Sequence, residues 1–190
     1  MKKSALLILL TLILIVPLAN AGTEKGATEI QVQGSFVNTT NSENDDKTMT
    51  STGQLSVNYF LTDWFSLGGS GRLSGSKTDY EDGSTDDSTN TTTFLMFNSD
   101  LYLGGPTKTF IPYVGVRLGI ANYKYESGGN DNSSSTASYG GHAGLKIFPS
   151  ENISWNLELD LTSYTPDAPE GQDETTYTDT SFLIGFSYYF

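Results

Sequence analysis

The residues best suited to chemistry are eight ionisable side chains that alternate with apolar residues along the chain. They are Glu29, Arg72, Asp100, Arg117, His142, Lys146, Glu158 and Asp160. Each stands on the polar side of a segment in which every second residue is apolar, so we expect all eight on the same face of a β-sheet. Buried charges need partners, and an arginine can bind a carboxylate through two parallel hydrogen bonds. The pattern therefore predicts an internal network of acid–base pairs.

The depth of each charge along its segment predicts which groups meet. Both arginines lie about as far from the predicted short turns as Glu158 and Asp160, so we expect the arginines to pair with these two carboxylates. Lys146 is expected to pair with either Glu29 or Asp100. Such a network is either a static polar plug or a gate whose ion pairs exchange and admit water. If the sheet closes into a narrow barrel, its interior is normally packed, which favours the plug.

His142 is the only histidine of the chain. A histidine close to a serine and an acid would suit acyl transfer. The sequence "HAG" at residues 142–144 places no serine beside it, and the chain has no cysteine for a His/Cys metal site. We therefore expect a structural histidine, no cofactor and no enzyme.

The segments that must position these residues have the two-residue period of β-strands. In "ISWNLELDL" (residues 153–161) the apolar side chains fall on one side and the polar ones on the other, which no helix maintains. The same alternation predicts eight strands, at residues 29–36, 53–60, 65–74, 95–103, 112–120, 140–148, 153–161 and 181–190. Three predicted turns are short, at residues 61–64, 104–109 and 149–152. Four connections are long and polar, at residues 41–49, 76–91, 125–136 and 165–176.

An even number of strands, with short turns at one end and long loops at the other, is typical of a bacterial outer-membrane barrel. A soluble barrel with an apolar inside has the same period. Aromatic residues favour the membrane, because they gather near the short turns (Tyr59, Trp64, Phe65, Phe110, Phe148, Trp155, Tyr188 and Phe190) and near the long loops (Tyr123, Tyr125, Tyr139, Tyr164 and Tyr177). Glycines on the apolar stripe would leave a soluble core underfilled. We therefore predict a closed, antiparallel, up-and-down barrel of eight transmembrane strands.

The N-terminus has the layout of a secretory signal peptide. Lys2 and Lys3 precede the apolar run "ALLILLTLILIV", and "ANA" at residues 19–21 fits a cleavage site. We expect residues 1–21 to be removed and residues 22–190 to form the barrel domain. The remaining chain has 8 Lys+Arg against 22 Asp+Glu, a net charge of −14, which excludes nucleic acid as a partner.

Most of the negative charge falls in the long connections, which hold 14 of the 22 acidic residues. The segment "DYEDGSTDD" (residues 79–87) suits weak binding of divalent cations, although it lacks the ligand spacing of an EF-hand. This segment could bridge to lipopolysaccharide through such cations, or it could be a solvated loop that binds nothing.

The chain ends on "GFSYYF", in which Gly185, Tyr188 and the terminal Phe190 resemble the C-terminal signal that the outer-membrane assembly machinery recognises. Closure of a barrel requires the last strand to pair with the first, so these residues should lie in a strand ladder. Together with the eight-strand layout, they make residues 22–190 resemble the small barrels of the OmpA-transmembrane-domain and OmpX type.

This resemblance implies a monomer in the outer membrane of a Gram-negative bacterium, in contact with lipids and lipopolysaccharide. We expect a non-catalytic protein that stabilises the membrane and presents acidic loops for adhesion or partner contact. A narrow porin-like channel for water, ions or small solutes is the alternative. A lipid A-modifying enzyme, as some eight-stranded barrels are, is less favoured.

Overall fold

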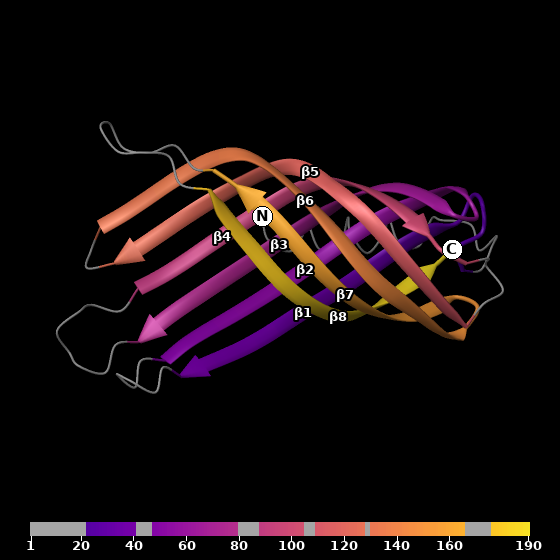
Figure 1. Cartoon of the computed structure of the whole chain (residues 1–190), viewed down its shortest axis with the longest axis horizontal. Helices are drawn as coiled ribbons and strands as arrows, with labels where there is room; N and C mark the ends of the chain where they lie inside the picture. Colours follow the sequence, from indigo (N-terminus) through magenta and orange to yellow (C-terminus); the bar gives the residue numbers. More distant parts are fainter. Residues whose placement is uncertain (1–21, 41–46, 80–87, 105–108, 128–129, 166–175) are drawn as a thin grey trace, which may run out of the picture.

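A computed structural model of the chain shows a closed barrel of eight antiparallel strands, joined in sequence order (Figure 1). The structure describes residues 22–40, 47–79, 88–104, 109–127, 130–165 and 176–190. The strands are β1 (Thr28–Thr40), β2 (Lys47–Thr62), β3 (Phe65–Asp79), β4 (Ser88–Tyr102), β5 (Phe110–Ser127), β6 (Asn130–Ser150), β7 (Ile153–Tyr164) and β8 (Tyr177–Tyr189). The predicted eight-stranded, up-and-down barrel is thus confirmed. Among the described residues, no helix is long and apolar enough to cross a membrane.

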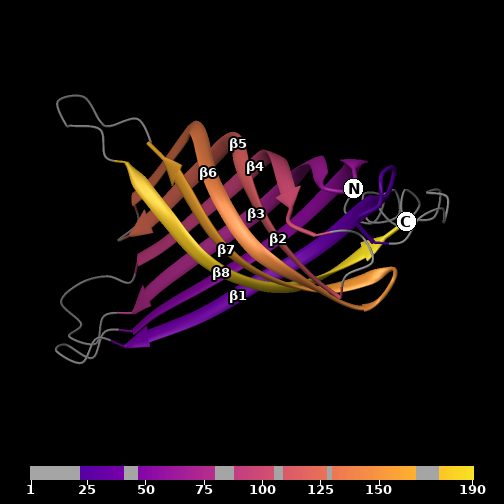
Figure 2. The same ribbon diagram turned by 45° about the vertical axis from the view of Figure 1, so that its right-hand side comes forward.

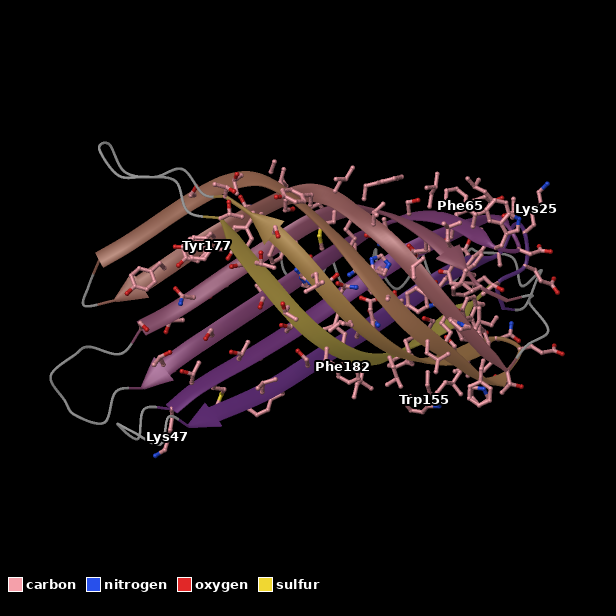
Figure 3. All side chains as sticks on the ribbon, in the orientation of Figure 1. Lys25, Lys47, Phe65, Trp155, Tyr177 and Phe182 are labelled. Carbon is pink, nitrogen blue, oxygen red and sulfur yellow. The ribbon has the colours of Figure 1, made fainter. Side chains whose placement is uncertain are left out.

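Side-chain alternation gives the barrel an apolar outside and a polar inside. Along β7, Trp155 and Leu159 are exposed, whereas Glu158 and Asp160 are buried. Figure 3 shows Trp155 and Phe182 projecting from the outer wall. An exterior of this composition is unfavourable in water and suits the hydrocarbon core of a membrane.

The barrel closes where β8 pairs with β1, so the first and last strands lie side by side (Figure 2). Their register runs from Glu29↔Tyr189 to Gly34↔Ile184. Two further hydrogen bonds extend the seam: the amide of Phe190 donates to the carbonyl of Thr28 (2.9 Å), and the amide of Thr28 donates to the carbonyl of Phe190 (3.2 Å). The predicted pairing of the last strand with the first is confirmed.

The prediction of a long connection at residues 125–136 is wrong. β5 continues to Ser127 and β6 begins at Asn130, with Tyr125 paired to Asn132. The Ser- and Asn-rich composition suggested a loop, but a strand ladder is made by backbone groups and does not require apolar side chains. These residues therefore lengthen a hairpin at the long-loop end of the barrel.

Several predictions fall on residues outside the described ranges. They include the signal peptide at residues 1–21, most of the other long connections (residues 41–46, 80–87 and 166–175) and part of the turn at residues 104–109. The proposed cation-binding segment at residues 79–87 belongs to this group, apart from the backbone of Asp79.

Several aromatic residues predicted at the membrane interfaces instead face the interior. Tyr164 is buried in an apolar cluster within the barrel near the long-loop end, Tyr123 packs against that cluster, and the ring of Tyr177 stacks on both. Phe148 packs against a second internal cluster near the short turns. The prediction considered distance along the strand alone, whereas the side of the strand decides whether a ring meets lipid or lumen.

Residues 22–27 form turns against the short-turn end of the barrel. Gly26 adopts a left-handed φ of 92° and donates a backbone hydrogen bond to the carbonyl of Phe60 (2.8 Å). This bend buries Ala27 against the ring of Phe60. The N-terminal segment therefore contributes to the apolar floor of the lumen.

Candidate functional site: the charged lumen

Asp160 lies at the centre of the charge network. It projects from β7 and binds the guanidinium groups of both Arg72 and Arg117, one to each carboxylate oxygen. Thr162 donates a third hydrogen bond to Oδ1 of the same carboxylate (2.7 Å). Asp160 and both arginines are buried. One carboxylate therefore partly neutralises the charges of two buried arginines, which come from β3 and β5.

Glu158 forms the second contact of Arg117. Nη2 of Arg117 donates to Oε1 of Glu158 at 2.8 Å, and the hydroxyl of Tyr113 donates to Oε2 at 2.7 Å. Tyr113 and Glu158 come from β5 and β7, which are separated by β6. Gly144 lies between them in the register, and a Cβ at Gly144 would collide with the Tyr113 ring. The missing side chain lets the strands on either side of β6 exchange a hydrogen bond.

A second glycine, Gly115, leaves space for a contact between His142 and Asp100 in the same way. Asp100 on β4 and His142 on β6 both pair with Gly115 on β5. Nε2 of His142 lies 2.8 Å from Oδ1 of Asp100, and a Cβ at Gly115 would collide with both groups. The ring of His142 also packs edge-on against Tyr113, with centroids 5.9 Å apart. This glycine position therefore provides the space for the His142–Asp100 pair.

Lys146 and Glu29 form the ion pair nearest the short turns. Glu29 also accepts hydrogen bonds from Asn58 (3.2 Å) and from the hydroxyl of Tyr189 (3.0 Å). Nζ of Lys146 lies 5.0 Å from the centroid of the Tyr113 ring, a favourable position for a cation over an aromatic face. Both charges are thus held among aromatic rings.

The structure brings all eight ionisable residues that were singled out in the sequence into the lumen, where each is buried. Both arginines meet the β7 carboxylates, although only Arg117 meets Glu158. Lys146 binds Glu29, while Asp100 binds His142. Four carboxylates thus face three permanent cations and one imidazole, and the network is formally neutral when that imidazole carries a proton.

Two apolar layers enclose the charges. The lower layer, towards the short-turn end, contains Ala27, Phe60, Tyr102, Ile111, Tyr113 and Tyr189, of which Tyr113 lies at the depth of Glu158. The upper layer contains Phe94, Met96, Ala121 and Tyr164. The guanidinium carbon of Arg72 sits 4.4 Å from the centroid of the Phe94 ring, which joins the upper layer to the network. Most of the charges therefore lie between two groups of aromatic side chains.

Sequence reasoning missed the neutral partners of the network. Tyr113 lies four residues before Arg117 on the same face of its strand, and Asn58 and Tyr189 are likewise on lumen-facing positions. The alternation that identified the charges could have identified these residues as well. Within the described residues, no three acidic or histidine side chains are grouped so that they could hold a metal ion.

The residues of the predicted assembly signal lie along the closing seam. Gly185 pairs with Gln33 of β1, and Tyr188 pairs with Ile30. The rings of Tyr188 and Phe190 meet edge to face, with centroids 4.8 Å apart. A Cβ at Gly185 would collide with the backbone of Val32 and Gln33, so this glycine allows β8 to approach β1 closely.

Comparisons with known proteins agree with this architecture. A family model described as the outer membrane protein beta-barrel domain matches residues 6–190. A search of curated proteins finds no significant match.

Several solved structures share the fold at low sequence identity. The N-terminal barrel domain of Pseudomonas aeruginosa OprF is 21% identical, with a TM-score of 0.51, over 87% of this chain and 98% of that one. Neisserial surface protein A is 14% identical, with a TM-score of 0.56, over 86% and 99%. Yersinia pestis Ail, in complex with the heparin analogue sucrose octasulfate, is 13% identical, with a TM-score of 0.53, over 87% and 99%.

Proposed function

This chain belongs to the family of outer membrane β-barrel domains, and on that premise we propose that it is a non-catalytic membrane protein with a sealed lumen. The observation that carries the proposal is the Arg72–Asp160–Arg117–Glu158 cluster, which is buried and spans the barrel from β3 to β7. A plug made of paired charges stays in place because separating any pair exposes an uncompensated charge at low dielectric.

The outer surface supports a structural and interactive role. The exposed apolar wall would anchor the barrel in lipid, and the Gly185–Phe190 segment would guide its assembly, as the resemblance of its C-terminus implies. The acidic connections would face outward and present the protein to partners. Sucrose octasulfate, which is bound in the Ail structure, is a polyanion. A net charge of −14 after residue 21 argues against the same class of ligand here.

The competing proposal is a narrow channel. Nε and Nη2 of Arg72 and Nε of Arg117 are buried, and none of them meets a hydrogen-bond acceptor among the described residues. These donors could bind water or an anion if the ion pairs exchanged partners. Catalysis has less support, because His142 and its partner Asp100 are both buried in the lumen, away from the lipid that a lipid A-modifying enzyme would act on.

Liposome swelling distinguishes a sealed lumen from an open one. The protein, expressed as the full chain and purified from outer membranes, is reconstituted into vesicles and exposed to an osmotic gradient of glycine. We expect swelling no faster than in protein-free vesicles, because the aromatic layers and the charge cluster fill the lumen. A general porin in the same vesicles is the positive control. Swelling that increases with the amount of this protein would favour the channel instead.

A further inference from the structure

The mouth of the barrel at the long-loop end contains a cavity that is separate from the charge network of the lumen. It has a volume of about 250 Å³ and lies above the upper apolar layer. Its walls combine the rings of Tyr123, Tyr164 and Tyr177 with polar groups of Thr50, Ser76, Asn90, Thr92 and Asp179. Figure 3 shows Tyr177 at this end of the barrel, far from Phe65 and Lys25 at the other. Aromatic faces beside hydrogen-bonding groups form a binding surface with two kinds of contact.

The three tyrosines come from different strands and lie together. The ring of Tyr177 is nearly parallel to the rings of Tyr123 and Tyr164, at interplanar angles of 19° and 20° and centroid distances of 6.0 and 5.7 Å. Tyr164 packs edge-on against Phe94 below it, with centroids 5.6 Å apart. The aromatic part of the cavity is therefore supported from beneath by the upper apolar layer.

Hydrogen bonds hold the polar part in place. The hydroxyl of Tyr123 donates to Oδ1 of Asn90 at 3.0 Å, which fixes the side chain amide of Asn90. Ser181 donates to Oδ1 of Asp179 at 2.9 Å. The Asn90 amide is a donor as well as an acceptor, and a carboxylate can accept more bonds than one. The cavity thus offers oriented donors and acceptors close to the aromatic rings.

We propose that this cavity binds a single pyranose ring, either neutral or carrying an amino group. The apolar C–H face of such a ring stacks on an aromatic side chain, while its hydroxyls bond with the surrounding amide, hydroxyl and carboxylate groups. Among the described residues that line the cavity, Asp179 is the only charged one, and a protonated amino group would donate a charge-assisted hydrogen bond to its carboxylate. The acidic sequences of the flanking connections disfavour an anionic sugar.

The selectivity among sugars tests the proposal on the wild-type protein. Full-chain protein purified from membranes is placed in phospholipid nanodiscs, because detergents with sugar headgroups would compete for the cavity. Saturation-transfer NMR is then used to titrate glucosamine, glucose and glucuronate. We expect saturable binding in the order glucosamine, glucose and then glucuronate. The absence of saturable glucosamine binding, or a preference for glucuronate, would overturn the proposal.

Two substitutions place the binding in the cavity. Tyr177→Ala is expected to weaken glucosamine binding about tenfold, because it removes a stacking face at a half-exposed position. Asp179→Asn should abolish the preference for glucosamine over glucose. Tyr139→Ala is the matched control, since Tyr139 is exposed on the outer wall of β6. Equal loss in the control and in Tyr177→Ala would contradict the assignment.

The sugar could be a free solute or the terminal residue of a glycan. Comparing a monosaccharide with an oligosaccharide distinguishes these two sources. A chitosan oligosaccharide ends in the same amino sugar as the monomer. Binding of the oligosaccharide at least as tight as that of glucosamine would identify a receptor for glycan ends, whereas binding of the monomer alone would identify a site for solutes. Because the cavity lies above the sealed layers, its occupancy does not depend on whether the lumen conducts.

Discussion

Replacement of Asp160 by alanine is expected to destabilise the barrel by about 3–5 kcal/mol, the range found when one partner of a buried ion pair is removed. The effect should be large because this single carboxylate serves Arg72 and Arg117 together and also accepts a hydrogen bond from Thr162. Without it, Arg72 loses its ion-pair partner and Arg117 retains only Glu158. The free energy of unfolding is measured by urea titration of the protein in phospholipid vesicles.

A carboxylate outside the lumen provides the control for this experiment. Glu151 is exposed in the turn between β6 and β7, so Glu151→Ala should change stability little. The double variant Arg72→Met, Asp160→Asn should recover part of the loss, since it removes one of the stranded cations. Equal stabilities of Asp160→Ala and Glu151→Ala would show that the network does not hold the fold together.

Replacement of Gly185 by alanine is the second change with a large expected effect. The added Cβ would meet the backbone of Val32 and Gln33, which cannot move aside as the end of a flexible side chain can. Overpacking of this kind costs about 1–3 kcal/mol. The collision lies in the seam that closes the barrel, so we expect slower folding and a larger unfolded fraction. Both are followed by the difference in gel mobility between heated and unheated samples.

Gly53→Ala is the matched control for the seam variant. A Cβ at Gly53 meets nothing within 4 Å, because this glycine lies on the outer wall. Its substitution should therefore leave folding intact, and it could stabilise the strand by reducing the entropy of the unfolded chain. If Gly185→Ala folds as readily as Gly53→Ala, the close approach of β8 to β1 does not limit closure.

Much of this fold could be predicted because the two-residue period is a local property. In β7, "ISWNLELDL" shows in nine residues which side chains face lipid and which face the lumen. The extent of β5 and β6 could not be predicted, because residues 125–136 have a loop-like composition and their pairing depends on backbone groups. The sequence shows where the alternation of apolar residues ends. A strand can continue beyond that point, because its backbone hydrogen bonds do not depend on apolar side chains.

The partners of the charges were predictable in part. Similar depth was enough to bring the arginines to the β7 carboxylates, but it left Lys146 with two candidate partners. The choice depends on Gly115, whose missing side chain lets His142 reach Asp100 and so leaves Glu29 for Lys146. Contacts between strands that are not neighbours are set by such gaps, and residue spacing along one strand does not show them.

Single-channel recording in a planar bilayer shows whether the paired charges and the aromatic layers seal the lumen. Full-chain protein purified from outer membranes is compared with Arg117→Ala, which removes the contacts to both Glu158 and Asp160. We expect no conductance steps from the wild type and discrete steps from the variant. Regular steps from the wild type would contradict the seal and would make the lumen charges the selectivity filter of a channel.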